Sequence, residues 1–278
     1  MPCSGTGKII ILISLLFCTI CSFFPEAAAA DPPASDRLTI KVMTYNIRHG
    51  RGLDDEVNLD RVAWVIKAYK PDIVLLNEVD FNNRRSGQVD QTSYLAGLLG
   101  LPYSFFGPAI RRPYVADWSL QSSAYGNALL SRFPIIAARA ELLPPWPRME
   151  RRSLIVADIH INENTTLRFF GTHLGLHAGE RYRHVQHIAE LAAESSLPKL
   201  LAGDFNALPD SREIAYLKEM WTDPAPHVHE ATYPSLIPTY RIDYIFTSGD
   251  LAANIITYQV VPGAYASDHL PVILEIRL

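Results

Sequence analysis

Short apolar runs separated by polar turns cover most of the chain after residue 38, and many of them alternate between apolar and polar positions. Alternation with a period of two is typical of strands that are buried on one face. The pattern predicts strands at residues 38–46, 72–77, 124–131, 135–142, 153–161, 166–174, 198–202, 242–247, 254–260 and 271–277.

Apolar residues recur at helical spacing in three segments, which predicts helices at residues 58–69, 91–99 and 180–195. Residues 217–239 are irregular and rich in proline, which indicates a functional loop. Many strands and few helices run to the end of the chain without a linker. We therefore expect one α/β domain in which packed sheets carry helices on their outer faces.

The first thirty residues have the pattern of a targeting segment. Lys8 precedes an apolar run at residues 9–24, and small residues at 28–30 offer a cleavage site. We predict a signal peptide at residues 1–30, a linker at 31–37, a folded domain at 38–278 and export from the cytoplasm, to the periplasm or the cell exterior. The alternative is an uncleaved membrane anchor, although the run is shorter than the roughly 20 residues that a membrane span needs.

Composition narrows the class of protein. Hydrophobic residues make up 48% of the chain, which excludes a disordered protein. All three cysteines precede residue 31, so the exported chain would form no disulfide. The net charge is −4 and no basic run exceeds a pair of arginines, which disfavours tight binding of nucleic acid.

Polar residues stand at the ends of several predicted strands, where they can point into a cleft at the sheet edge. Asp204 and Asn206 lie on the same side of an extended chain, which suits a hard cation, a phosphate or a water molecule. Asn46 ends one other predicted strand, and Glu78 directly follows another. A tight turn or a solvated strand end is the alternative for each of these positions.

His269 precedes the last predicted strand and needs a carboxylate to fix its tautomer. Its neighbour Asp268 points away in an extended chain. Asp243 is an acid inside an apolar strand and is the plausible partner, although an ion pair with Arg241 would also explain it. His173 ends another strand, where a lone histidine is more often structural.

Together and in this order, the strand-end motifs resemble those of the endonuclease/exonuclease/phosphatase superfamily. They are YN at 45–46, NE at 77–78, YGN at 125–127, GTHL at 171–174, GDFN at 203–206, RIDYI at 241–245 and SDH at 267–269. The resemblance spans about residues 40–277, and NIRHG at 46–50 is similar to the start of a branch of small exported bacterial hydrolases.

The resemblance implies a four-layer α/β/β/α sandwich of two packed, mainly antiparallel sheets with flanking helices. It implies that the metal is held by Glu78, Asn46 and Asp268. The implied catalytic residues are His269, Asp204, Asp243, His173 and Asn206. The implied phosphate contacts are Asn127, His173 and Asn206. In this scheme Asp243 orients His269 as general base or acid, and Asp204 aligns or deprotonates the attacking water.

We therefore predict a secreted, monomeric hydrolase of phosphate esters, with a phosphodiesterase as the first choice. The expected metal is Mg²⁺ or Mn²⁺, and Ca²⁺ is possible. Nucleic acid, a phospholipid such as sphingomyelin and a small phosphorylated metabolite compete as substrates. His173 in its motif resembles pancreatic-type deoxyribonucleases, sphingomyelinases and inositol phosphatases. The alternatives are a non-catalytic binding protein on the same fold and a membrane-anchored lipid phosphodiesterase that touches lipid through residues such as Trp146 or Trp221.

Overall fold

The computed structural model describes residues 38–112, 122–225, 231–261 and 265–278, together with the first two residues. The predicted signal peptide and linker, at residues 1–37, lie outside the described residues except for these first two and stay predictions. Within the described part of the chain, none of the helices combines the length and the apolar character that crossing a bilayer requires.

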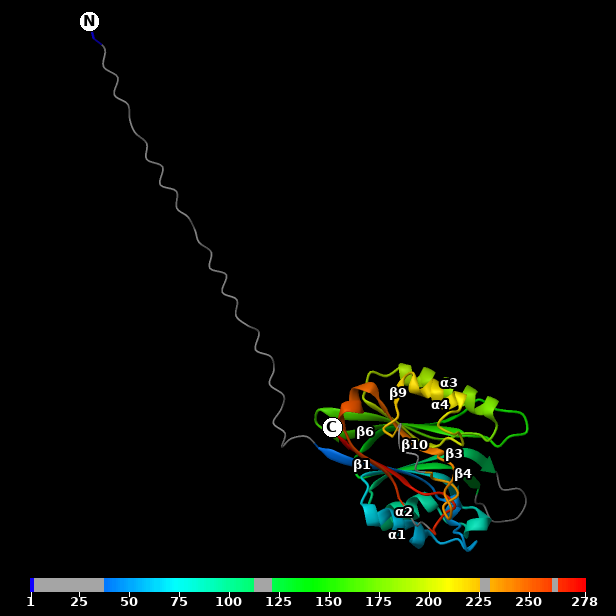
Figure 1. The fold of residues 1–278 in the computed structure, drawn as a ribbon. Helices are drawn as coiled ribbons and strands as arrows, with labels where there is room; N and C mark the ends of the chain where they lie inside the picture. The colour runs from blue at the N-terminus through cyan, green and yellow to red at the C-terminus, as the bar shows by residue number, and fades with distance from the viewer. Residues whose placement is uncertain (3–37, 113–121, 226–230, 262–264) are drawn as a thin grey trace. The chain divides into compact units, whose positions relative to one another are not determined.

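Two six-stranded sheets form the centre of the fold (Figure 1). The first sheet has the order β11-β12-β1-β2-β4-β3, with β11 at Ile255–Val260, β12 at Val272–Arg277, β1 at Thr39–Asn46, β2 at Ile73–Phe81, β4 at Ser123–Ser131 and β3 at Tyr103–Arg112. The second has the order β5-β6-β7-β8-β10-β9, with β5 at Ile135–Leu142, β6 at Ser153–Asn162, β7 at Thr165–His173, β8 at Lys199–Asp204, β10 at Asp243–Ser248 and β9 at Trp221–Thr222.

Each sheet is antiparallel except for one parallel pair, β1 with β2 and β7 with β8. A helix connects the two strands of each parallel pair, because parallel neighbours need a crossover. These helices are α1 at Leu59–Tyr69 and α3 at Ala178–Ala193. The remaining helices are α2 at Gln91–Leu99, α4 at Arg212–Lys218 and the short 3-10 helices Arg48–Gly50, Arg84–Ser86 and Gly249–Asn254.

Helices α1 and α2 cover the outer face of the first sheet, and α3 and α4 cover that of the second (Figure 1). The predicted four-layer α/β/β/α sandwich is therefore confirmed. Alternation along β1 shows how the sequence encodes these layers. Ile40 and Val42 pack between the sheets, whereas Met43 and Tyr45 pack against the helices. Burial of each such side chain contributes about 1.5–3 kcal/mol, which fixes the register of the strand.

Among the described strands and α-helices, three were missing from the prediction: β3, α4 and the two-residue β9. The apolar pattern of β3 is broken by Gly107 and Pro108, and its pairing with β4 shifts register just after Pro108. β3 lies at the edge of its sheet, which is where proline is tolerated because one side of the strand donates no ladder hydrogen bond.

The two tryptophans considered for membrane contact are not freely exposed, although Met220 beside Trp221 is 46% exposed. Trp221 is buried against Phe170 in the core beneath α3 and α4. Trp146 is half-buried and stacks on the ring of His177, with 4.9 Å between ring centroids.

Helical spacing alone places His184 on the solvent side of α3, but this histidine is buried beneath the helix. Its Nε2 atom lies 3.0 Å from the carbonyl oxygen of Pro144 and donates to it. Its Nδ1 atom is buried and has no hydrogen-bond partner among the described residues. Burial lowers the pKa of His184 to about 4, so the fold holds this ring neutral.

We expect the buried His184 to make the fold sensitive to mild acid. Its pKa is about 4 in the folded chain and 6.5 for a free side chain, so the unfolded chain binds more protons between these values. The free energy of unfolding should fall as the pH drops from 7 to 5, by about 1–2 kcal/mol more in the wild type than in His184→Gln. The glutamine amide can still donate to the Pro144 carbonyl.

Urea unfolding at both pH values measures this difference. His187→Gln is the matched control, since His187 lies on the same helix with 30% of its side chain exposed. Equal losses of stability in the wild type and His184→Gln would contradict the assignment of a neutral buried ring.

Candidate active site

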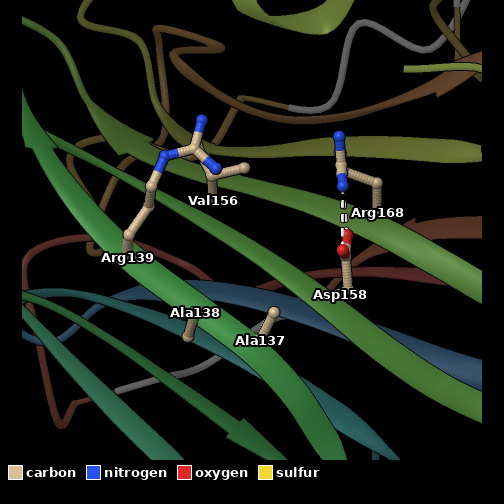
Figure 2. A pocket seen from close by; sticks show the side chains of 6 residues that line it. All are labelled: Ala137, Ala138, Arg139, Val156, Asp158 and Arg168. Carbon is tan, nitrogen blue, oxygen red and sulfur yellow. Dashed lines mark hydrogen bonds and ion pairs between the residues drawn. The ribbon is translucent and has the colours of Figure 1, made fainter. Parts of the chain in front are cut away.

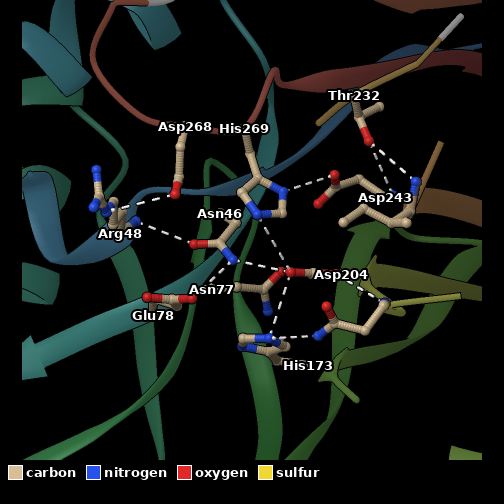
Figure 3. A network of polar contacts seen from close by, with 12 residues as sticks. Asn46, Arg48, Asn77, Glu78, His173, Asp204, Thr232, Asp243, Asp268 and His269 are labelled. Atoms are coloured by element: carbon tan, nitrogen blue, oxygen red, sulfur yellow. Dashed lines mark hydrogen bonds and ion pairs between the residues drawn. The ribbon is translucent and has the colours of Figure 1, made fainter. Parts of the chain in front are cut away.

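Polar side chains from both sheets meet at one edge of the sandwich (Figure 3). On each strand they lie on the same face as the apolar residues that pack between the sheets. Asn46 continues the series of Ile40 and Val42 on β1, and Asp243 shares its face with Ile245 on β10. The same phase holds for Asn77, Asn127, His173 and Asp204. The alternation that builds the core therefore also directs these residues into the gap between the sheets.

A β-bulge in β2 adds Glu78 to this group. Leu76 pairs with Ala128 and Val79 with Gly126, so Asn77 and Glu78 together lie opposite Asn127 alone. Glu78 has a φ of 60°, a left-handed conformation that is rare for residues other than glycine and asparagine. A regular strand would point Glu78 and Asn77 to opposite faces. In Figure 3 both side chains lie in the polar cluster, as a bulge permits.

The side-chain amide of Asn77 ties the two sheets together. Its Nδ2 atom donates to Asn127 Oδ1 over 2.8 Å and to the Thr172 carbonyl over 2.9 Å. Its Oδ1 atom accepts from the backbone N–H of Asp204 over 3.0 Å. Asn77 is fully buried, so each of these bonds replaces one to water that burial removed.

Gly203 lets the end of β8 approach β7 at this point. Its φ of 145° lies outside the range that side-chain-bearing residues adopt readily, and a Cβ there would stand 1.8 Å from the Thr172 carbonyl oxygen. The close approach brings His173 and Asp204 into register as neighbours across the parallel pair.

His269 and Asp243 form a buried pair. The Nδ1 atom of His269 donates to Asp243 Oδ2 over 2.9 Å, and the backbone N–H of Asp243 lies 3.3 Å from the hydroxyl of Thr232, which accepts from it. Burial opposes the charge on His269, but Asp243 and Asp204 together raise its pKa above the ordinary range. The pairing that the sequence predicted for Asp243 is present, and Arg241 instead pairs with Asp223.

Asp204 lies at the centre of the cluster (Figure 3). Its Oδ2 atom accepts from Asn46 Nδ2 over 3.0 Å and lies 3.7 Å from His269 Nε2 and 3.4 Å from His173 Nε2. Its Oδ1 atom accepts from the backbone N–H of Asn206 over 2.9 Å. Burial and the nearby charge of Asp243 raise the pKa of Asp204, so its carboxyl group can accept a proton more readily than a solvated one.

His173 is held by an arginine that the sequence analysis did not single out. Arg152 is buried, and its Nη1 atom lies 3.2 Å from His173 Nδ1. A guanidinium can only donate, so Nδ1 accepts from Arg152, while Nε2 lies near both Asp204 and the side-chain amide of Asn206. Burial first, and Arg152 next, lower the pKa of His173 well below its usual value. Asn206 Nδ2 contacts the same ring over 3.1 Å.

Glu78, Asn46 and Asp268 form the other side of the cluster. Asn46 Nδ2 donates to Glu78 Oε1 over 3.2 Å, and Arg48 Nε lies 3.5 Å from Asp268 Oδ2. Burial raises the pKa of Glu78, and the charge of Asp268 adds to that rise. In the described part of the chain no basic side chain forms an ion pair with Glu78. A carboxylate so placed fits a hard divalent cation, which prefers oxygen ligands.

A second group of metal-ligand type is formed by Asp204, Asp243 and His269, whose ligand atoms lie within 4.8 Å of one another. There the histidine already compensates the carboxylates by hydrogen bonding and charge. Glu78 has no such partner, so the donor set around Glu78 fits a cation better.

The residues predicted from the sequence thus meet in one cluster, with Asn127 at its base. Asn127 is buried, accepts from Asn77 and donates to the Ser153 carbonyl over 3.1 Å. Its contact with phosphate stays a prediction. No site role was predicted for Asn77, Arg48, Arg152 or Tyr233, whose ring centroid lies 4.8 Å from that of His269. Only their positions in the sequence, within or beside the motifs or at the start of a strand, could have pointed to a role for these residues.

A separate depression on β5, β6 and β7 lacks comparable chemistry (Figure 2). Its one carboxylate, Asp158, is engaged by Arg168 through two hydrogen bonds of 2.7 and 2.8 Å. Arg139 is paired with Glu141. The polar cluster is therefore the better candidate for an active site.

Comparison with known proteins identifies the family and the fold. Residues 43–269 match the model of the Endonuclease/Exonuclease/phosphatase family. An endonuclease/exonuclease/phosphatase from Beutenbergia cavernae DSM 12333 is 25% identical, with a TM-score of 0.69 over 86% of this chain and 72% of the other. A search of curated proteins gave no significant match.

Two structures with named activities share the fold at lower identity. The mannosyl-6-phosphatase of Bacteroides thetaiotaomicron VPI-5482 is 18% identical, with a TM-score of 0.65 over 86% of this chain and 99% of the other. Sphingomyelinase C from Streptomyces griseocarneus is also 18% identical, with a TM-score of 0.58 over 86% of this chain and 99% of the other.

We expect Asn77→Leu to destabilise the protein by about 2–5 kcal/mol, because it removes three buried hydrogen bonds and leaves their partners in a dry environment. The matched control is Thr44→Val. Thr44 is also fully buried, but its hydroxyl has no partner among the described residues. The control should change stability by less than about 1 kcal/mol. Urea unfolding followed by circular dichroism measures both, and equal effects would mean that the Asn77 amide does not join the sheets.

Proposed function

The chain belongs to the endonuclease/exonuclease/phosphatase family, and we propose that it is a divalent-metal-dependent hydrolase of phosphate esters. The observation that carries the proposal is the line of contacts from Asp243 through His269 to Asp204, with Glu78 in the same cluster. The proposal covers phosphodiesters, which the sequence favours, and monoesters, the substrate type named for the mannosyl-6-phosphatase of the same fold.

In the proposed reaction the oxygen of water bonds to phosphorus while the bond from phosphorus to the alcohol oxygen breaks. One proton leaves the water and one joins the departing alcohol. Asp204 accepts the proton of the water. His269 gives a proton to the alcohol, and Asp243 stabilises its charged form and holds the ring in place.

Neutral side chains surround the position of the phosphate in this scheme. His173 contributes its Nε2 atom, because Arg152 occupies Nδ1. Asn206 lies beside it. Donors of this kind stabilise the negative charge that grows on the equatorial oxygens in the transition state.

Glu78, Asn46 and Asp268 are the proposed ligands of Mg²⁺ or Mn²⁺. When bound, the cation neutralises charge on the phosphate and on the leaving oxygen. The fit rests on the partly buried Glu78 carboxylate, whose only described hydrogen bond comes from Asn46. Export of the chain is a further part of the proposal, supported by the apolar run at residues 9–24 and the small residues that follow it.

We expect His269→Asn to lower kcat for phosphate esters by at least about 100-fold. The asparagine amide can still donate to Asp243, which keeps the buried pair, but it cannot transfer a proton. Phosphate release from a monoester and alcohol release from a diester would be measured with Mg²⁺, Mn²⁺, Ca²⁺ or a chelator. His187→Asn on the surface of α3 is the control and should keep full activity.

Turnover that persists in His269→Asn would exclude His269 as the proton carrier. A wild-type chain that hydrolyses no ester with any metal would instead favour the non-catalytic binding protein on the same fold.

A separate prediction concerns the cation alone. Millimolar Mn²⁺ should raise the Tm of the wild type by about 2–5 °C, since a ligand that binds only the folded state stabilises it. Glu78→Gln should lose most of this rise, whereas Glu190→Gln, with 78% of its side chain exposed, should retain it. A full Mn²⁺ response in Glu78→Gln would place the cation elsewhere, with the group of Asp204, Asp243 and His269 as the next candidate.

A further inference from the structure

A pocket adjoins the catalytic cluster on the side of the second sheet. Asn206 and Tyr233 belong to both, since Asn206 contacts His173 and the ring of Tyr233 lies against His269. The rest of the lining includes Leu208, Asp210, Tyr240 and Ile242. A phosphate ester held at the cluster can therefore extend its alcohol part into this pocket.

The two tyrosines are positioned together by a backbone bridge. The N–H of Tyr233 donates to the Tyr240 carbonyl over 3.0 Å, and the N–H of Tyr240 donates back over 2.8 Å. Residues paired in this way across an antiparallel bridge present their side chains on the same face. Tyr240 is 50% exposed and Tyr233 is half-buried, so an aromatic surface remains open to a ligand.

The same loop is anchored to the segment that carries His269. Ser235 N donates to the Asp268 carbonyl and Ser235 Oγ to the Ser267 carbonyl, each over 2.7 Å. The N–H of Leu270 donates to the Thr232 carbonyl over 2.8 Å. The aromatic surface is therefore fixed relative to the catalytic histidine, as a substrate-positioning element must be.

The charges at the pocket disfavour a second anion. Arg181 contributes a guanidinium to the lining, but its Nε atom donates to the buried Glu213 and its Nη1 atom to the Leu176 carbonyl over 2.6 Å. Asp210 is exposed and has no hydrogen bond or ion pair within the described part of the chain. An unpaired carboxylate beside a neutralised arginine accepts hydroxyl donors and repels a further phosphate.

We infer that this pocket binds the alcohol part of the substrate and that this part is an uncharged, polyhydroxylated ring such as a sugar or a cyclitol. The inference rests on the proposed phosphate-ester hydrolysis. A ring of this kind packs its apolar face on Tyr240 and donates hydroxyl hydrogens to Asp210. A nucleic acid strand would place its next phosphate near the unpaired carboxylate of Asp210, in a chain whose net charge is −4.

The test compares esters with and without the ring, using the full chain. Glucose 6-phosphate, glucose 1-phosphate and myo-inositol 1-phosphate, each as the monoester and as its ethyl diester, are compared with ethyl phosphate and diethyl phosphate. In the wild type the best ring ester should exceed the matching ethyl ester in kcat/KM by about tenfold or more. Tyr240→Ala and Asp210→Ala should each lower this ratio by about tenfold.

Asp210→Asn separates hydroxyl recognition from cation recognition. The asparagine carbonyl still accepts hydroxyl hydrogens, so the ratio should recover in part. Phosphocholine as the preferred ester, with Asp210→Asn as harmful as Asp210→Ala, would overturn the inference in favour of a cationic group. Leu236→Ala, at a residue of the same loop that is 67% exposed and outside the pocket, should leave the ratio unchanged. The inference would also be overturned if neither Tyr240→Ala nor Asp210→Ala changed the ratio of kcat/KM values.

Saturation-transfer NMR with methyl glucoside and myo-inositol tests the pocket without hydrolysis. The wild type should bind at least one of them and Tyr240→Ala should not. Binding without turnover of any ester would remove the proposed function and keep the pocket as a ring site. Failure of both ring alcohols to bind would overturn the inference even if esters are hydrolysed.

Discussion

The buried amide of Asn77 is the interaction on which the candidate site depends. Two sheets that pack through apolar side chains can slide and rotate slightly, because hydrophobic contacts carry no direction. Asn77 adds directional bonds to Asn127 in its own sheet and to Thr172 and Asp204 in the other. The positions of the two strands that carry His173 and Asp204 are thus fixed relative to β2.

The bulge at Glu78 allows two consecutive side chains to point to the same face, which a regular strand does not permit. A strand can send only every second side chain to one face, yet the site uses both Asn77 and Glu78. The extra residue and the positive φ of Glu78 direct both toward the other sheet. Such a conformation costs about 1–3 kcal/mol and persists only where the surroundings determine it. The core on both faces of β2 and the Asn77 amide supply that constraint.

The layers of the fold could be predicted because alternation and helical spacing report which face is buried, as Ile40 and Met43 show on β1. Asp243 was predictable as the partner of His269 because an unpaired acid in an apolar strand is costly. The contact of Arg152 with His173 was not predictable, since a pair of arginines before a strand carries no signal of direction. The burial of His184 was missed because helical spacing alone places it at the margin of the apolar face of α3.

The balance of charge at the site supports the proposal that a cation and a phosphate bind there together. Four acids bring negative charge to the cluster: Glu78, Asp204, Asp243 and Asp268. His269 compensates the charge of Asp243 and Asp204, and Arg48 lies beside Asp268. A phosphate ester that entered would meet uncompensated carboxylate, with Glu78 foremost, and would be repelled. A divalent cation bound at Glu78, as proposed, would reverse the sign of the local potential. The acids that would exclude the substrate would then make its binding dependent on the metal.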